Sequence, residues 1–192
     1  MMKKDIINLT EILSLITEEI IKSTDEFKSY DCNQILISAA SNRAGSRGVT
    51  YGKLQPLKFE NGNSLIKHKG RLYAMPKLIY NNHEIKYIIY YYFPKFFDLP
   101  AKEKINVMFH ELYHISPDFN GDIRRMGKFK KAHGHSKKFF EDQYIYMADS
   151  FYQKFQNSIY NNFLEMTSED LLKVYKKVTY TKIRTIKPIL VK

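Results

Sequence analysis

The hydrophobic pattern divides the chain into a helical beginning, a β-rich middle and a helical second half. Within residues 1–30, apolar side chains recur at steps of three and four and predict an amphipathic helix: Ile6, Leu9, Leu13, Ile16 and Ile20. The polar face of this helix is acidic, which disfavours adsorption to a membrane. We therefore expect the helix to dock on a single domain formed by residues 31–192, with a partner-binding helix as the alternative.

Four segments in the middle of the chain have the pattern of β-strands: residues 34–39, 49–59, 71–75 and 84–93. The last of them is the richest in tyrosine and isoleucine, and Pro94 follows it, which favours a place near the edge of a sheet. An edge strand can pair with the backbone of an extended peptide, so this segment is a candidate border of a binding cleft. A strand that only fills the core is the equal alternative.

Residues 99–114 predict a second helix. Pro100 suits its first turn, where a missing N–H costs nothing, and Pro117 lies just beyond its end. Apolar residues at helical spacing predict that most of this helix is buried. Near the C-terminus, Thr167 to Asp170 predict a capped short helix, and residues 179–186 predict a strand or an extended tail.

The second helix carries the most informative motif of the chain, His110-Glu111-Leu112-Tyr113-His114. Two histidines four residues apart share one face of a helix, so both imidazoles can reach one metal ion. Glu111 lies beside that position and can take a proton from a metal-activated water. Two incidental core histidines are the alternative, but burying two histidines and a glutamate without partners is costly. The motif therefore indicates a hydrolytic zinc centre.

A catalytic zinc site needs three protein ligands and one open position. His133-Gly134-His135 precede a further helix, whose apolar stripe is formed by Phe140, Tyr144, Met147, Phe151 and Phe155. Ser136 is a natural N-cap for that helix, so His135 would lie at a fixed helix entrance, and we assign it as the third ligand. His133 is the competing choice, and a solvated His-Gly-His turn is the remaining alternative.

The segment from His110 to Phe140 resembles the phage metallopeptidase family and, more distantly, SprT-type zinc proteases. The resemblance rests on residues 110–115, 119–125 and 133–136, with an aromatic residue following. It implies a zincin-like α+β domain with an N-terminal helix, a small mixed or antiparallel sheet, the active helix and a second core helix. It also implies zinc, a glutamate base and a phage or mobile-element origin. SprT relatives often add a cysteine-rich zinc ribbon, which this chain cannot form because it has one cysteine, Cys32.

Composition and charge add two expectations. A chain of 192 residues with 44% hydrophobic content suits one compact domain, and a single cysteine fits a reducing, cytoplasmic compartment. No apolar run is long enough to cross a membrane. The net charge of +11 favours contact with nucleic acid or another polyanion, and the loop 42–48, which holds Arg43 and Arg47, is a candidate phosphate contact. A lysine-rich surface that only keeps the protein soluble is the alternative.

These observations predict a zinc-dependent metallopeptidase that acts on a protein or peptide substrate. Zn²⁺ would be held by His110, His114 and His135, with Glu111 as the general base. One alternative is a catalytically idle nucleic-acid-binding module with a structural zinc, although such a site has no use for an unligated carboxylate. A zinc hydrolase with a non-peptide substrate is another.

Two acidic and two basic residues between the ligands have candidate supporting roles. Asp118 or Asp122 would accept the second N–H of a ligand histidine. Arg124 or Arg125 would pair with one of these carboxylates to hold the loop, or would stabilise an oxyanion.

Overall fold

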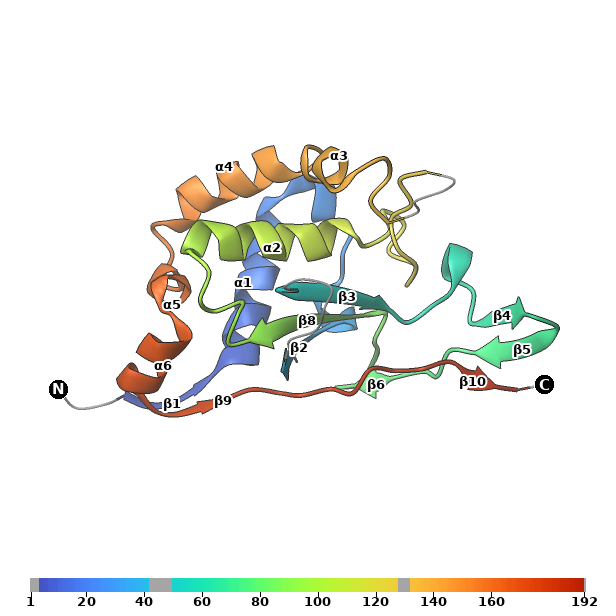
Figure 1. Cartoon of the computed structure of the whole chain (residues 1–192), viewed down its shortest axis with the longest axis horizontal. Helices are drawn as coiled ribbons and strands as arrows, with labels where there is room; N and C mark the ends of the chain where they lie inside the picture. The colour runs from blue at the N-terminus through green and yellow to red at the C-terminus, as the bar shows by residue number, and fades with distance from the viewer. Residues whose placement is uncertain (1–3, 42–49, 128–131, 192) are drawn as a thin grey trace.

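The computed structural model describes residues 4–41, 50–127 and 132–191, so the basic loop 42–48 lies outside the described residues. The architecture is α+β: helices pack on one face of a central sheet, and the C-terminal segment crosses the other (Figure 1). Helix α1 (Leu9–Ser23) is the predicted amphipathic helix, and its apolar stripe is buried. It begins at Leu9 because the Asn8 side chain accepts the N–H of Glu11.

Ile6 is not part of this helix, contrary to the prediction. It lies in strand β1 (Lys4–Asn8), which pairs in parallel with β9 (Tyr175–Thr179) near the other end of the chain. Ile6 is 65% exposed and Ile7 is buried, because successive side chains of a strand point to opposite faces.

The central sheet has the strand order β2 (Ile35–Ser41), β8 (Tyr87–Phe93) and β3 (Gly52–Pro56). Strand β8 pairs in parallel with β2 and antiparallel with β3. The tyrosine-rich strand is therefore central and not at an edge, which corrects the prediction drawn from Pro94. Pro94 follows the last residue of the ladder and so removes no hydrogen bond from it. Strands β2 and β3 are the outer strands of this sheet.

The two faces of the sheet are covered differently. One face packs on α1 and on α2 (Ala101–Tyr113) through buried residues that include Ile37, Ile89 and Tyr91. The other face forms a small cluster around Ile88, against which Ile183 of the C-terminal segment packs. That segment runs along the lower edge of the molecule in Figure 1. It continues from β9 as extended chain, as the alternation of residues 179–186 predicted.

Smaller elements complete the middle of the chain. Strands β4 (Leu65–His68) and β5 (Arg71–Ala74) form a sheet with β10 (Ile189–Leu190), at the right-hand end of Figure 1. Strands β6 (Ile79–Tyr80) and β7 (His83–Glu84) form a hairpin. Three short 3₁₀ helices span Asp25–Phe27, Cys32–Gln34 and Glu60–Gly62.

The second half of the chain is helical. The predicted core helix is divided into α3 (Lys137–Glu141), capped by Ser136 as expected, and α4 (Ile145–Phe155), which packs on α2. Two short helices follow, α5 (Asn161–Glu165) and α6 (Ser168–Val174), and the predicted capping box at the start of α6 is present. Within the described ranges, no helix is both long enough and apolar enough to cross a membrane.

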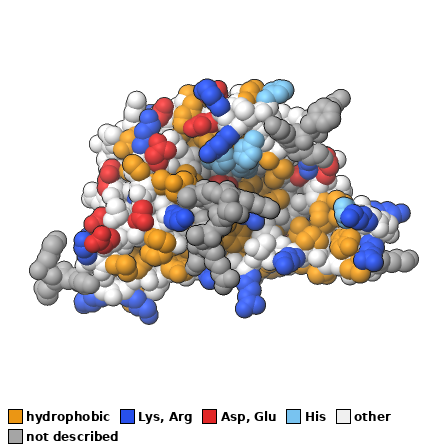
Figure 2. Space-filling view, viewed as in Figure 1, with side chains coloured by type: hydrophobic (Ala, Val, Ile, Leu, Met, Phe, Trp, Pro, Cys, Tyr) orange, Lys and Arg blue, Asp and Glu red, His pale blue; other side chains and the backbone are white. Residues whose placement is uncertain are grey.

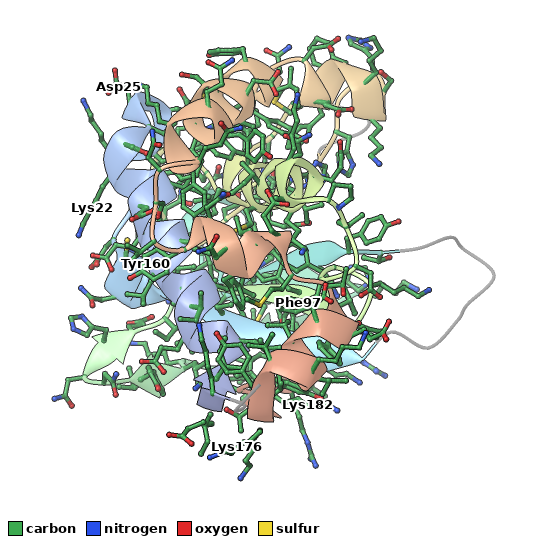
Figure 3. The ribbon with its side chains drawn as sticks, turned by 90° about the vertical axis from the view of Figure 1, so that its left-hand side faces the viewer. Lys22, Asp25, Phe97, Tyr160, Lys176 and Lys182 are labelled. Atoms are coloured by element: carbon green, nitrogen blue, oxygen red, sulfur yellow. The ribbon has the colours of Figure 1, made fainter. Side chains whose placement is uncertain are left out.

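A buried lysine of α2 holds the C-terminal end of α5 in place. Lys104 is 1% exposed, and its Nζ donates to the carbonyl oxygens of Leu164 at 2.6 Å and Met166 at 2.7 Å. Burial lowers the pKa of Lys104 to about 8. Figure 3 shows this side of the molecule, with Phe97 and Tyr160 labelled among the packed helices.

Candidate metal centre and active site

Three histidines meet at the end of α2. The Nε2 atoms of His110 and His114 are 3.1 Å apart, and Nε2 of His133 lies 3.4 Å from Nε2 of His110. One nitrogen from each ring lies within 4.8 Å of the others. Tetrahedral zinc with Zn–N bonds of about 2.05 Å places neighbouring ligand nitrogens roughly 3.3 Å apart. The donor set therefore fits a zinc ion bound by three imidazoles.

The structure brings His133 into this group and leaves His135 out of it. His135 is exposed, and its ring lies against Phe139, with 5.4 Å between the centroids. Gly134 separates the two histidines and has a φ of +62°, a conformation that glycine adopts without strain. The turn directs His133 toward α2 and His135 toward solvent. The histidine that meets the pair from α2 is thus the alternative of the sequence analysis and not the assigned one.

The buried setting keeps the three rings neutral. Burial, reinforced by the neighbouring histidines, lowers the pKa of His114 to about 3. Burial also lowers the pKa of His110 to about 4, with smaller contributions from His133 and Lys137. The pKa of His133 is lowered as well, chiefly by burial. All three are therefore uncharged at neutral pH, which is the form that binds a metal ion.

Glu111 lies beside the histidines and directly beneath strand β3. It is 4% exposed, and burial raises its pKa to about 8 against the opposing effects of the Leu54 backbone hydrogen bond and the charge of Lys53. A Cβ atom at Gly52 would lie 2.8 Å from Oε1 of Glu111 and 2.9 Å from Cγ1 of Val107. Only a glycine lets the strand approach this carboxylate so closely. Gly52 is a site residue that sequence reasoning missed.

A cleft of about 740 Å³ opens over this group. Its lining includes His110, Glu111, His114, His133 and residues 50–54. Figure 2 shows pale-blue histidine side chains at the surface of this face, with hydrophobic side chains beside them.

The free edge of β3 borders the cleft. The N–H of Tyr92 donates to Tyr51 O, and the N–H of Leu57 donates to Lys86 O. Because ladder bonds alternate along an antiparallel pair, the backbone groups of Gly52 and Leu54 point away from β8. The cleft therefore has a strand edge beside the histidines, where the Leu54 N–H donates to the Glu111 carboxylate and the other backbone groups of Gly52 and Leu54 face outward.

A family model described as putative phage metallopeptidase matches residues 7–160. The chain belongs to this phage metallopeptidase family. The match includes α1, the central sheet, α2 and all three clustered histidines. No curated protein and no solved structure matches the chain. The resemblance found in the sequence is thereby confirmed at the level of the family.

In this member of the family, Tyr144 supports one of the ligand candidates. Its hydroxyl lies 3.1 Å from Nδ1 of His110, the ring nitrogen that does not face the other histidines. Such a partner fixes the orientation and tautomer of a ligand histidine. We predicted Asp118 or Asp122 for this role, but Asp118 is exposed and Asp122 has other partners. Tyr144 was predicted only as a core residue of the apolar stripe.

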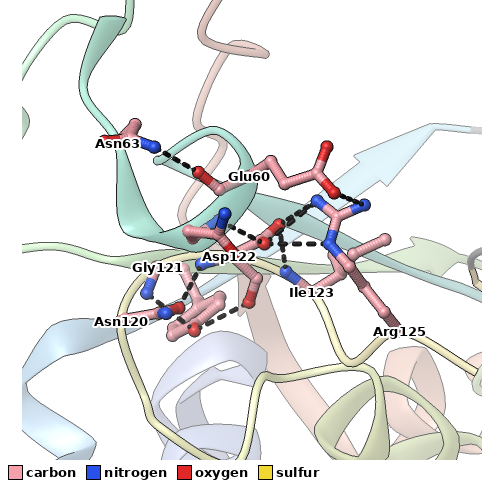
Figure 4. Close-up of polar contacts among 9 residues, drawn as sticks. Glu60, Asn63, Asn120, Gly121, Asp122, Ile123 and Arg125 are labelled. Carbon is pink, nitrogen blue, oxygen red and sulfur yellow. Dashed lines mark hydrogen bonds and ion pairs between the residues drawn. The ribbon is translucent and has the colours of Figure 1, made fainter.

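Asp122 organises the loop that follows α2 (Figure 4). Its carboxylate accepts the backbone N–H groups of Asn61 at 3.0 Å and Ile123 at 2.8 Å, and it pairs with Arg125 at 2.8 Å. Arg125 also reaches Glu60 at 3.5 Å. The predicted pairing of an arginine with Asp122 is present, and it ties the loop to the segment after β3.

Arg124 has a similar structural role. Its Nε donates to Tyr113 O at 2.9 Å, Nη2 pairs with Glu26 at 2.8 Å, and the guanidinium lies 4.0 Å from the centre of the Tyr113 ring. Neither Arg124 nor Arg125 is among the described residues that line the cleft. Both arginines hold the loop beside His114, and neither is placed to stabilise an oxyanion there.

Proposed function

We propose that the protein is a zinc-dependent metallopeptidase with a zincin-like active site. The observation that carries this proposal is the convergence of His110, His114 and His133, at nitrogen separations that suit tetrahedral zinc, beside the unligated carboxylate of Glu111. Membership of a phage metallopeptidase family supports the same reaction class and a phage origin. His133 takes the place that the sequence analysis gave to His135.

Each part of the site has a chemical task in this proposal. A bound zinc ion supplies a Lewis acid that lowers the pKa of water to about 7 and polarises a carbonyl group. Glu111 accepts the proton of the attacking water and delivers it to the leaving amine. A divalent cation nearby favours the ionised carboxylate and so offsets the effect of burial on Glu111. Tyr144 holds the His110 ring in the orientation that directs Nε2 toward the metal.

The substrate is an extended peptide that adds to the free edge of β3. The outward-facing backbone groups of Gly52 and the carbonyl group of Leu54 pair with its main chain and hold the scissile bond next to Glu111, whose carboxylate accepts the Leu54 N–H. Asn106, one helical turn before His110, also lines the cleft, and its Oδ1 has no hydrogen-bond partner among the described residues. It is available to accept an N–H of the peptide.

A catalytically idle module with a structural zinc fits these features less well. Structural zinc sites are closed by four protein ligands, whereas the described residues supply a group of three that opens onto a cleft. The buried carboxyl group of Glu111, which is not among the histidine ligands, would also serve no purpose in such a module.

Removal and return of the metal tests the proposal. Cleavage of an unfolded protein substrate should stop when the protein is stripped of metal with a chelator, and one equivalent of zinc should restore it. Cleavage that continues in metal-free protein, as verified by elemental analysis, would exclude a metallopeptidase.

A further inference from the structure

The face of the central sheet opposite α2 contains a second hollow, of about 250 Å³. Its walls come from the three sheet strands and the C-terminal segment, through Ala39, Ala40, Lys53, Tyr90, Tyr92 and residues 182–185. Lys53, Lys182 and Arg184 place three positive charges around this small space, and no Asp or Glu is among the described residues that line it.

The walls of the hollow are fixed by hydrogen bonds. Thr181 O accepts the N–H of Ala39 at 2.9 Å, and the N–H of Ile183 donates to Oγ of Ser38 at 2.9 Å. Further along, Gln55 donates to Ile186 O at 2.5 Å. The C-terminal segment is therefore held across the sheet on both sides of Lys182 and Arg184.

The C-terminal segment that lines the hollow has no acidic residue to offset its positive charge. From Leu171 to Lys192 the chain contains no Asp or Glu, while lysines and arginine recur throughout. Figure 2 shows blue Lys and Arg side chains along the lower edge of the molecule, and Figure 3 labels Lys176 and Lys182 at this edge. Like charges held around one space repel each other, so an anion that enters it is stabilised by all three.

We propose that this hollow is a binding site for phosphate groups. The side chains of Lys53, Lys182 and Arg184 supply several charged donors of the kind that a phosphate with three or four acceptor oxygens requires. The phosphate comes either from the backbone of a nucleic acid or from free phosphate. The hollow and the peptidase cleft share Lys53, whereas Lys182 and Arg184 line the hollow and not the cleft.

Two double variants of the full chain test the site. Lys182→Gln with Arg184→Gln removes two of the three charges, and both side chains are exposed, so the fold should be kept. Lys22→Gln with Lys154→Gln is the matched control, because it removes two exposed charges from α1 and α4. Binding of a labelled single-stranded DNA oligonucleotide is measured by fluorescence anisotropy over a series of salt concentrations. Binding of inorganic phosphate is measured by titration calorimetry.

We expect the hollow variant to bind the oligonucleotide at least about tenfold more weakly at low salt, with a salt slope smaller by roughly 1.4, which corresponds to two lost phosphate contacts. The control variant should change both values much less. If the natural protein binds inorganic phosphate and not the oligonucleotide, and the hollow variant binds neither, the source is free phosphate. Equal losses in the two variants, or no binding of either probe, would overturn the proposal. Zinc content and peptide cleavage should stay unchanged in both variants, so failure here is distinct from failure of the peptidase proposal.

Discussion

Substitution of Gly52 by alanine tests the link between strand β3 and the general base. The added methyl group would lie 2.8 Å from Oε1 of Glu111 and 2.9 Å from Cγ1 of Val107. Ordinary contact begins at about 3.4 Å, so the carboxylate must move by roughly 0.6 Å or the strand must retreat by a similar amount. A misplacement of about 1 Å can cost roughly 100-fold in rate, so we expect kcat/KM to fall by about tenfold.

The same substitution should leave the metal in place. The three atoms nearest to the methyl group belong to Glu111 and Val107 and not to the histidines, and overpacking of this kind typically costs about 1–3 kcal/mol of stability. In a domain of this size, that corresponds to a fall in Tm of roughly 2–12 °C. The assays are cleavage of a fluorogenic peptide, zinc content by elemental analysis and thermal unfolding. The matched control is Gly127→Ala, where an added Cβ would meet no described atom within 4 Å.

Two results would contradict the proposed contact between β3 and Glu111. Full activity in Gly52→Ala would show that β3 does not constrain Glu111. Loss of zinc together with activity would show that the effect does not act through the carboxylate.

Three further predictions concern the histidines, Tyr144 and Glu111. His133→Ala should abolish stoichiometric zinc binding while His135→Ala retains it, as measured by elemental analysis; the opposite result would restore the sequence-based assignment. Tyr144→Phe should weaken zinc binding by about 10–100-fold in a competition with a chelator, because His110 loses its Nδ1 partner, and an unchanged affinity would contradict that role. In metal-free protein, Glu111→Gln should raise Tm at pH 8 and not at pH 4. Burial raises the pKa of Glu111 from 4.5 to about 8 in the folded protein. The stability that Glu111 contributes is therefore fully present below pH 4.5 and is lost as the pH rises through 8. A Tm that rises equally at both pH values would rule out ionisation as the cause.

Local geometry explains what the sequence could predict. Helix α2 follows from apolar spacing and Pro100, and residues four apart on a helix share a face whatever surrounds them. His110, Glu111 and His114 therefore had to lie together once the helix was recognised. The capping box of α6 is equally local, because it involves residues three apart.

Long-range packing explains what the sequence could not predict. The central place of β8 depends on its pairing with Ile35–Ser41, more than forty residues earlier. A proline that follows the ladder does not indicate whether the strand is central or at an edge. The choice between His133 and His135 depends on the φ of +62° at Gly134, which glycine permits but does not require. The contact of Tyr144 with His110 depends on how α4 packs on α2. The position of Tyr144 in the apolar stripe predicted only that its side chain is buried.

Zinc content and peptide cleavage, measured together in Glu111→Gln, test whether Glu111 is the general base of a zinc peptidase. We expect one zinc per chain, as in the natural protein, and a loss of cleavage of at least about 100-fold, because the site keeps its ligands and loses its base. Glu165→Gln, an exposed position on α5, is the control and should keep both properties. Cleavage that persists in Glu111→Gln with zinc bound would contradict the proposed role of Glu111 and the metallopeptidase mechanism built on it.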